Sequence, residues 1–297
     1  MKNLKIISMA IAILSLASCD KSEEELNSQT PQQQDQSIHA MGAKFVDEAT
    51  YNSFEKADIN ELSLKFKGKD AASAKKVLPA SYLINGSVIG DQGNEGSCVG
   101  WATAYAAASI LEYNFKGVTQ PRSPEYVYNQ IKAGSDCKSG SYTNNALNLI
   151  KKQGVCSITE MPYNDTDCST QPTVAQKTAA ATHKFISWAT VSNTDIPGIK
   201  NLISMNLPVI VGMTVDEEFK NLKNTGWILN KRTGKVLGGH AVCIVGYDDA
   251  KQAFKIQNSW GTSWGDNGYF WIDYNFFKKN AFFGGGVINE TFVAYVQ

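Results

Sequence analysis

The feature that most constrains the fold is a change in sequence pattern near the middle of the chain. Between residues 98 and 153, apolar residues recur at the three- and four-residue spacing of helices. From residue 184 onward, short runs rich in β-branched and aromatic residues are separated by Gly, Asn and Asp. Helices first and strands later predict an α+β protein with two packed subdomains. The expected strands are KFISWATVS, LPVIVGMTV, GGHAVCIVGYD, AFKIQNSW, GYFWIDY and TFVAYV.

The helical half carries clear start and stop signals. The segment CVGWATAYAAASILEY, residues 98–113, is rich in Ala, and Gly117 follows it. Ser123-Pro124-Glu125 is a helix start, because Ser is a good N-cap and Pro suits the first helical position. Further helices are expected over residues 144–153, which end at Gly154, and near residues 195–206.

Cys98 lies where the glycine-rich stretch GDQGNEGSC meets the Ala-rich helix. Such a thiol could be a buried small side chain, half of a disulfide, or a nucleophile in the first turn of the helix. At a helix N-terminus, the dipole and the unpaired N–H groups stabilise an anion, and a nearby imidazolium stabilises it further. Both lower the pKa of a thiol, so a thiolate–imidazolium pair can exist near neutral pH.

His240 lies in a predicted strand that the chain enters through two glycines. It could be a core histidine, but a metal site shared with Cys243 is disfavoured because residues three apart on a strand point to opposite faces. Asn258 can accept the other imidazole N–H and hold the ring, and Trp260 can cover that pair. The other two histidines, expected to be solvated and without a role, are His39 and His183.

Gln92, six residues before Cys98, completes a candidate oxyanion hole. Its side-chain amide and the Cys98 backbone N–H would donate hydrogen bonds to a tetrahedral intermediate. One such donor contributes about 3–4 kcal/mol in the transition state. A thiol nucleophile, an imidazole base, an orienting amide and an oxyanion donor together predict acyl transfer through a thioester.

The first residues, MKNLKIISMAIAILSLASCD, predict export from a bacterial cell. Lys2 and Lys5 precede an apolar run that is too short to span a membrane, and small residues then lead to Cys19 in a sequence that resembles a lipobox. We expect a signal peptide over residues 1–18 and a lipidated Cys19 that anchors the protein at the cell envelope. Residues 19–40 are polar and Gln-rich, which predicts a disordered tether.

Three motifs occur in one order: GDQGNEGSC before a helix, then GHAVCIVGYD, then NSWGTSWGDNGYFWI. They resemble a papain-like cysteine peptidase of the bacterial lipoprotein type, over residues 80–297. The resemblance implies a helical half over about residues 80–183, a β-barrel-like half over about residues 184–297, and an active-site cleft between them that binds an extended peptide. It assigns catalytic roles to Cys98, His240, Asn258 and Gln92, shielding to Trp260, substrate contacts to Gly140 and Gly239, and a disulfide to Cys137 and Cys168.

Some positions depart from the family pattern. Glu95 stands where many members have a half-cystine, and Val99 and Gly100 precede Trp101 where many have Trp directly after the nucleophile. The small residues around His240 predict an apolar pocket for the second substrate residue on the acyl side of the scissile bond. The two remaining cysteines, expected to be buried thiols, are Cys156 and Cys243.

Residues 41–79 are expected to be either an inhibitory pro-segment or a spacer between the membrane and the enzyme. Lys75-Lys76, just before Val77-Leu78-Pro79, is a candidate processing site. In the first case the chain carries its own inhibitor, as is usual in the family that it resembles.

The main prediction is therefore a cysteine endopeptidase acting on peptides or proteins as a monomer, with no cofactor and no metal. Lys plus Arg and Asp plus Glu both number 28, and without a basic patch we expect no nucleic-acid partner. Two alternatives stay open: a catalytically inactive papain-like surface binding protein, and acyl transfer to amines as in transglutaminases. The string Gly96-Ser97-Cys98-Val99-Gly100 also fits the nucleophile elbow of α/β-hydrolases, but no buried strand precedes it.

Overall fold

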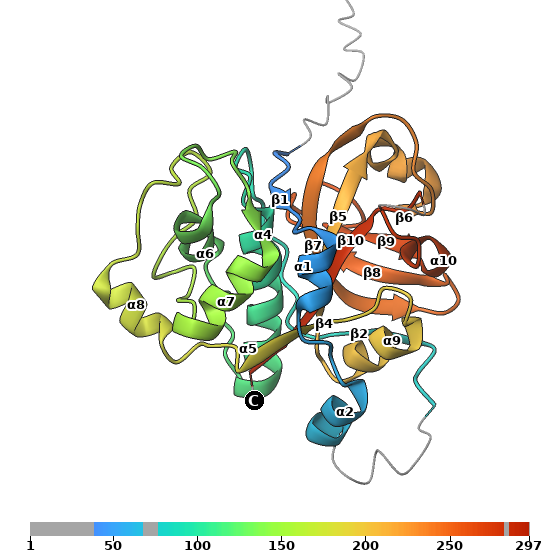
Figure 1. Ribbon diagram of the computed structural model, residues 1–297, viewed down its shortest axis with the longest axis horizontal. Coiled ribbons are helices and arrows are strands. Elements are labelled where there is room, and N and C mark those ends of the chain that lie inside the picture. The colour runs from blue at the N-terminus through green and yellow to red at the C-terminus, as the bar shows by residue number, and fades with distance from the viewer. Residues whose placement is uncertain (1–38, 68–76, 282–284, 297) are drawn as a thin grey trace, which may run out of the picture. The chain divides into compact units, whose positions relative to one another are not determined.

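The computed structural model describes residues 39–67, 77–281 and 285–296. The predicted signal peptide, Cys19, most of the predicted tether and the Lys75-Lys76 site lie outside these residues. In the described part, helices gather on one side and a large sheet on the other, so the α+β class with a helical and a β-rich half is confirmed (Figure 1).

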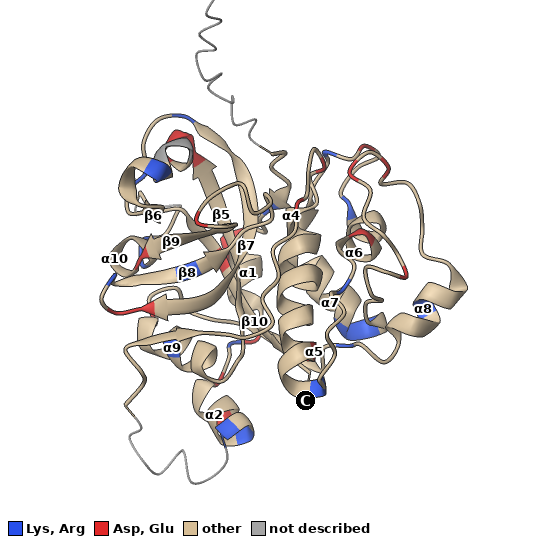
Figure 2. Ribbon diagram, turned by 180° about the vertical axis from the view of Figure 1, so that it is seen from behind, with Lys and Arg blue, Asp and Glu red and all other residues tan. Residues whose placement is uncertain are grey.

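One long, buried helix begins at Cys98 and forms the centre of the helical half. It consists of α4 (Cys98–Gly100), a π-helical stretch (Trp101–Ala108) and α5 (Ser109–Lys116), and it ends at Gly117, whose φ of 68° is left-handed. Its alanines allow close packing on all sides, and Figure 2 shows it almost free of charged residues before its last turns. The predicted helix is thus confirmed, although nothing in the sequence indicated its π-helical middle.

The remaining helices begin and end close to the predicted signals. The Ser123 hydroxyl accepts the Tyr126 N–H at 3.1 Å, and Pro124 occupies the first turn of its helix. Gly154, with φ of 84°, follows the next helix. These helices and the later ones are α6 (Pro124–Ile131), α7 (Thr143–Gln153), α8 (Val174–Ala180), α9 (Ile196–Ser204), the 3-10 helix η2 (Glu217–Thr225) and α10 (Tyr274–Phe277).

The β-rich half is an eight-stranded sheet in the order β4-β10-β5-β7-β8-β9-β6, with β2 paired to β7. All of its pairs are antiparallel except β6 with β9. Each of the six predicted runs overlaps one strand, and β7, which carries His240, is buried from that residue to Tyr247. The strands are β2 (Ser81–Leu83), β4 (Ser187–Thr190), β5 (Val209–Asp216), β6 (Ile228–Leu229), β7 (Val236–Asp248), β8 (Ala253–Gln257), β9 (Tyr269–Asp273) and β10 (Ile288–Tyr295).

The segment before the predicted catalytic domain packs on it through specific contacts. It contains β1 (Ala43–Lys44), α1 (Glu48–Ser53) and α2 (Ile59–Lys67), and β1 pairs in parallel with β3 (Ser141–Tyr142). The Tyr51 hydroxyl accepts the Thr291 N–H at 2.9 Å and donates to the Thr291 carbonyl at 3.0 Å. The Phe54 ring meets the Trp188 ring edge-on at 5.3 Å. In Figure 1, α1 lies where the two halves meet.

The cysteines within the described residues form one disulfide and three buried thiols. Cys137 and Cys168 are joined, which is the pair that the family resemblance implied. Cys98, Cys156 and Cys243 are free and buried. No helix within the described ranges combines the length and the apolar character needed to cross a bilayer.

The Cys137–Cys168 bridge spans 31 residues of sequence, so it restricts the unfolded chain. We expect the double variant Cys137→Ser/Cys168→Ser to lose about 3–4 kcal/mol of unfolding free energy, the loop-entropy estimate for a bridge of this span. Urea unfolding with and without a reductant measures the loss. The reductant should lower the urea midpoint of the wild type toward that of the variant and leave the midpoint of the variant unchanged. If reduction does not change the midpoint of the wild type, the prediction is wrong.

Candidate active site

His240 and Asn258 form the fixed part of the site. His240 Nε2 lies 2.7 Å from Asn258 Oδ1, and both side chains are buried. Because an amide oxygen only accepts, the imidazole donates its Nε2–H, and a neutral ring then carries its lone pair on Nδ1. That nitrogen has no hydrogen-bond partner among the described residues. The ring is therefore held in the tautomer that can accept a proton from another group.

Trp260 covers this pair, as the sequence predicted. Its ring lies 4.9 Å from the His240 ring, at an interplanar angle of 35°, and it is itself buried. Phe219 and Trp264 pack against it edge-on at 5.3 and 5.0 Å. An aromatic wall of this kind excludes water from the imidazole–amide hydrogen bond.

Gln92 is oriented by hydrogen bonds on both ends of its amide. The Ser259 hydroxyl donates to its Oε1 at 2.7 Å, and its Nε2 donates to the Glu95 carbonyl at 2.9 Å. The second Nε2 hydrogen bond, also 2.9 Å, goes to the carbonyl of Ala40. One Nε2–H is thus used within the loop that precedes Cys98, and the other is directed at the carbonyl oxygen of Ala40, as an oxyanion donor would be.

Cys98 begins the long helix and contacts β7 through its sulfur. The backbone N–H groups of Ala241, the residue after His240, and of Gly42 both donate toward the thiol. The Ser97 hydroxyl does not cap the helix and instead lies 2.6 Å from the Tyr163 hydroxyl. The first turn of the helix therefore has no side-chain cap from Ser97 that would compete with the sulfur for its N–H groups.

Residues 39–46, which we call the strap, run across all of these groups. His39 stacks on Trp260 with ring centroids 5.3 Å apart, Ala40 accepts from Gln92, and Gly42 contacts Cys98. The expectation that His39 is solvated was wrong, because it also bonds Asp91 at 2.9 Å. His183 was also expected to be solvated, and this expectation was wrong too, because its Nδ1 lies 2.5 Å from Glu112 Oε2.

The two predicted substrate-contact glycines also touch the strap. A Cβ atom added at Gly140 would lie 2.2 Å from the Gly42 carbonyl oxygen, and one at Gly239 would lie 2.1 Å from the Ala43 carbonyl oxygen. The Ser141 N–H donates to the Gly42 carbonyl at 2.8 Å. The nucleophile, the oxyanion donor, the aromatic cover and both glycines thus all contact the strap.

Both reactive groups are neutral in this covered state. Burial raises the pKa of Cys98 to about 11, although the N–H groups of Ala241 and Gly42 lower it. Burial also lowers the pKa of His240 to about 4, against the raising effect of the Asn258 hydrogen bond. The predicted thiolate–imidazolium pair is therefore not formed here, because both groups are fully buried and no water solvates their charges. For the uncovered site it stays a prediction.

Two buried carboxyl groups behind the nucleophile loop were not predicted as part of the site. Glu95 and Glu125 are both buried. Burial raises the pKa of each to about 7, and the charge of Glu125 raises that of Glu95 further. In the sequence, Glu125 appeared to be an ordinary first-turn acid of a helix. Only the absence of a half-cystine at Glu95 marked that position as unusual.

In the described ranges, one group of potential metal-binding side chains lies close enough together to share an ion. Glu95, Cys137 and Cys168 place their ligand atoms within 4.8 Å of one another. The two sulfurs form the disulfide and so are not thiolates, the form in which cysteine binds metals.

The fold and this arrangement of thiol, imidazole and amide define a thiol-dependent peptidase class. The chain belongs to the papain family of cysteine proteases, whose family model matches residues 84–282. It is 30% identical over 200 residues to an uncharacterized peptidase C1-like protein of Acanthamoeba polyphaga mimivirus, covering 63% of this chain and 64% of that protein. It is 34% identical over 187 residues to the gamete and mating-type specific protein A of Dictyostelium discoideum, covering 61% and 39%. The chain thus spans less than two thirds of either relative.

Solved structures agree with this fold. Xylellain, a cysteine protease from Xylella fastidiosa, superposes with a TM-score of 0.68 at 23% identity, covering 87% of this chain and 96% of that one. A procathepsin B from Trypanosoma congolense superposes with a TM-score of 0.65 at 19% identity, covering 87% of each chain. At these identities the likeness establishes the papain-like fold.

Gln92→Ala should lower kcat about 10²–10³-fold with little change in KM, because the lost N–H stabilises charge that develops only in the transition state. Steady-state hydrolysis of a fluorogenic peptide measures both constants. Gln92→Glu keeps the shape but replaces the donor with an acceptor, so it should be at least as impaired. A fall in kcat/KM that comes wholly from KM would show that Gln92 only binds substrate.

The buried acids predict an unusual pH dependence of stability. In the native state Glu95 titrates near 7, above the value of about 4.3 for an unfolded Glu, so the native state binds the extra proton. The contribution to stability is complete below about pH 4 and is lost as pH rises to about 7. Glu95→Gln should therefore gain about 1–3 kcal/mol over wild type at about pH 8 and little at about pH 4.

Urea unfolding at the two pH values tests this expectation. Glu61→Gln, on the exposed surface of α2, is the matched control and should follow the wild type at both. A gain for Glu95→Gln that is equal at both pH values would show that titration of this carboxyl is not the cause.

Proposed function

We propose that this chain is a cysteine endopeptidase that hydrolyses peptide bonds through a Cys98 thiolate and a His240 imidazolium. One observation carries the proposal: the thiol at the start of the long helix receives the N–H of the residue next to His240, whose ring is fixed by Asn258. Membership of the papain family supports it.

The geometry suggests how each step would proceed. His240 Nδ1 takes the thiol proton, and the thiolate adds to the peptide carbonyl carbon. The carbonyl oxygen becomes an oxyanion, which the Gln92 Nε2–H and the Cys98 N–H stabilise in the place where the Ala40 carbonyl now lies. The imidazolium then protonates the departing amine, leaving a thioester. Water, deprotonated by the imidazole, hydrolyses the thioester and restores the thiol.

We also propose that the structure represents an inhibited precursor, with the strap as the inhibitory element of a pro-segment. The strap buries Cys98, occupies the oxyanion donor, and presents the Gly42 N–H to the sulfur. The contacts of α1 with β10 and the parallel pairing of β1 with β3 hold it in place. A spacer would not need such contacts, so they favour the pro-segment over that alternative.

The N-terminal sequence supports a location at the bacterial cell envelope. We propose that Cys19 is lipidated after removal of residues 1–18 and that the lipid anchors the enzyme to the membrane. Metabolic labelling with a fatty-acid analogue should mark the wild type and leave Cys19→Ser unmarked.

Peptide-library cleavage by the wild type and by Cys98→Ala tests the endopeptidase proposal. We expect internal cleavage of peptides by the wild type and none by the variant, because the variant lacks the nucleophile. Labelling by a peptidyl epoxide separates the alternatives. A binding protein without catalytic chemistry would bind peptides yet show no His240-dependent labelling of Cys98.

Displacing the strap should expose the nucleophile in the full-length chain. A Cβ atom added at Gly42 would lie 1.8 Å from the Gly96 carbonyl oxygen, so Gly42→Ala cannot keep the strap where it is. We expect iodoacetamide to alkylate Cys98 at least about tenfold faster in Gly42→Ala than in wild type, since 1.4 kcal/mol against the covered state suffices for that factor.

Gly117→Ala is the matched control for this experiment. It is the same substitution away from the strap, with no atom within 4 Å of the added Cβ but with strain at its left-handed φ of 68°, so it shows what destabilisation without strap displacement does to labelling. Mass spectrometry of the alkylated peptide identifies the labelled cysteine. Equal labelling rates in wild type and Gly42→Ala would mean that the strap does not limit access to Cys98.

A further inference from the structure

The nucleophile loop, residues 92–98, carries both donors of the candidate oxyanion hole. The Gln92 side chain supplies one N–H, and the Cys98 backbone supplies the other. The Gln92 backbone N–H donates to the Ser259 carbonyl at 2.8 Å, and Cys98 begins the long helix, so each end of the loop is fixed to a different part of the fold. A small shift of the loop would move the Gln92 amide away from the oxygen that it is to stabilise.

Two hydroxyl groups, which we call the hydroxyl pair, lie along this loop. The Tyr163 hydroxyl donates to the Gln92 backbone carbonyl at 2.7 Å, and this bond uses its single proton. The Ser97 hydroxyl lies 2.6 Å from the Tyr163 hydroxyl, so Ser97 must be the donor in that contact. Both hydroxyl protons are therefore already engaged, and the hydroxyl oxygens can only accept from a further group.

Glu95 is the buried side chain beside the hydroxyl pair. It is fully buried, and neither of its carboxyl oxygens has a hydrogen bond of normal geometry within the described part of the chain. Its polar neighbours are the hydroxyls of Tyr163 and Ser97. A protonated carboxyl group can donate to either hydroxyl oxygen, whereas a carboxylate can only accept. The neutral form is therefore compatible with the existing hydrogen bonds, and the ionised form competes for their protons.

The titratable groups that face Glu95 are acids and phenols. Glu125 and Tyr128 lie on α6, and Tyr163 and Asp165 lie in the segment between α7 and α8. No Lys or Arg of the described ranges forms an ion pair with Glu95. Burial raises its pKa to about 7, and the charge of Glu125 raises it further, against the lowering effect of the two hydroxyls. The carboxyl group therefore changes from a donor to an acceptor near neutral pH.

Ionisation of Glu95 would reach the oxyanion donor through the hydroxyl pair. The carboxyl proton passes to water, and the carboxylate then attracts the proton of one hydroxyl. If Tyr163 turns toward it, the Gln92 carbonyl loses its 2.7 Å bond and keeps the Glu95 N–H at 3.4 Å. The Gln92 side chain also donates to the Glu95 carbonyl at 2.9 Å. Movement of either residue therefore moves the amide that would stabilise the oxyanion.

We propose that Glu95 is a positioning residue of the oxyanion hole: its protonated carboxyl group holds the nucleophile loop in the active geometry through Ser97 and Tyr163, and its ionisation displaces Gln92. This inference rests on the proposed peptidase function and deepens it, because it adds an ionisation outside the catalytic pair that controls hydrolysis. At this position, where many members of the family have a half-cystine, a contact that depends on a proton stands in place of a covalent bond.

The test compares two reactions of Cys98 in the full-length chain across about pH 5 to about pH 9. Hydrolysis of a fluorogenic peptide, chosen from the products of the library experiment, needs the oxyanion hole. Alkylation by iodoacetamide displaces iodide and forms no oxyanion. Both reactions need the thiolate and a displaced strap, so these two requirements cancel in the quotient of kcat/KM and the alkylation rate constant.

We expect the wild-type quotient to fall about tenfold around pH 7, where Glu95 ionises, which is a fraction of what one oxyanion donor contributes. Glu95→Gln keeps an N–H donor and cannot ionise, so its quotient should lack this step. Loss of the His240 proton lowers hydrolysis in both proteins and gives the fall that remains in the variant.

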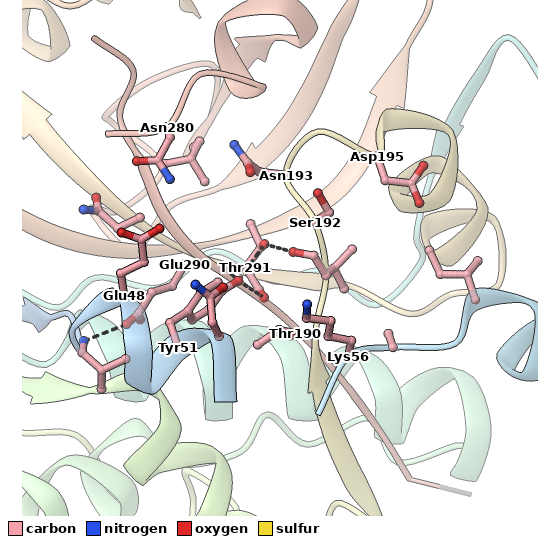
Figure 3. Close-up of a pocket in the computed structure, with 17 residues that line it drawn as sticks. Glu48, Tyr51, Lys56, Thr190, Ser192, Asn193, Asp195, Asn280, Glu290 and Thr291 are labelled. Carbon is pink, nitrogen blue, oxygen red and sulfur yellow. Dashed lines mark hydrogen bonds between the residues drawn. The ribbon is translucent and has the colours of Figure 1, made fainter. Parts of the chain in front are cut away.

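Glu125→Gln supplies a second measurement. Without the charge of Glu125, Glu95 ionises more readily, so the step should move to lower pH, a shift that a purely structural role would not produce. Glu48→Gln is the matched control. Glu48 lies at the start of α1 and lines a cavity between α1 and β10, whose lining includes no residue of the nucleophile loop (Figure 3). This variant should keep the wild-type profile.

The comparison of wild type with Glu125→Gln stands alone if Glu95→Gln does not fold. A wild-type quotient without a step near pH 7, a step that persists in folded Glu95→Gln, or a step at the same pH in Glu125→Gln overturns the inference and leaves the peptidase proposal intact. If the wild type cleaves no peptide at any pH while iodoacetamide labels Cys98, both proposals fail.

Discussion

The contact between the first turn of the long helix and strand β7 is the constraint on which the rest of the structure depends. It brings Cys98 from the helical half to the N–H of Ala241 in the β-rich half, one residue from His240. Neither half alone contains both a nucleophile and a base. The alanine-rich, almost uncharged helix allows this approach, and burial of β7 from His240 to Tyr247 gives the base a rigid support. Catalytic competence is therefore a property of the packing between the halves.

The strap binds to the same surface that carries the predicted catalytic residues. It contacts the oxyanion donor, the nucleophile, the aromatic cover and Gly239, each with a different residue. It thereby reverses the electrostatics of the site, because burial favours a neutral thiol and a neutral imidazole where catalysis needs both charged. If the strap is the inhibitor that we propose, inhibition and ionisation are one equilibrium, because water that enters when the strap leaves would also stabilise the ion pair.

Much of the fold was predictable from local sequence, and the reasons are physical. Helix caps such as Ser123 and the β-branched runs of the second half are short-range signals, and the structure follows them. Motifs in a fixed order indicated Cys98, His240 and Asn258; in the structure, His240 is hydrogen-bonded to Asn258, and Cys98 contacts Ala241, the residue after His240. The strap carries no such signal, since residues 39–46 have neither helical nor strand periodicity and owe their conformation to distant partners. For that reason His39 was taken as solvated.

If the strap inhibits the enzyme as we propose, its anchoring by α1 has a consequence for the timing of activation. Tyr51 and Phe54 hold this segment to β10 and to Trp188 by noncovalent contacts that do not require an intact chain between α2 and β2. A cut in that connection would change the inhibitor from a covalently linked one, at high effective concentration, to a bound one that can diffuse away. Proteolysis would then begin activation without exposing the active site at once. The rate at which the cut segment dissociates from the enzyme would set the delay before full activity. The delay would be longer where the released segment stays concentrated near the enzyme and can bind again.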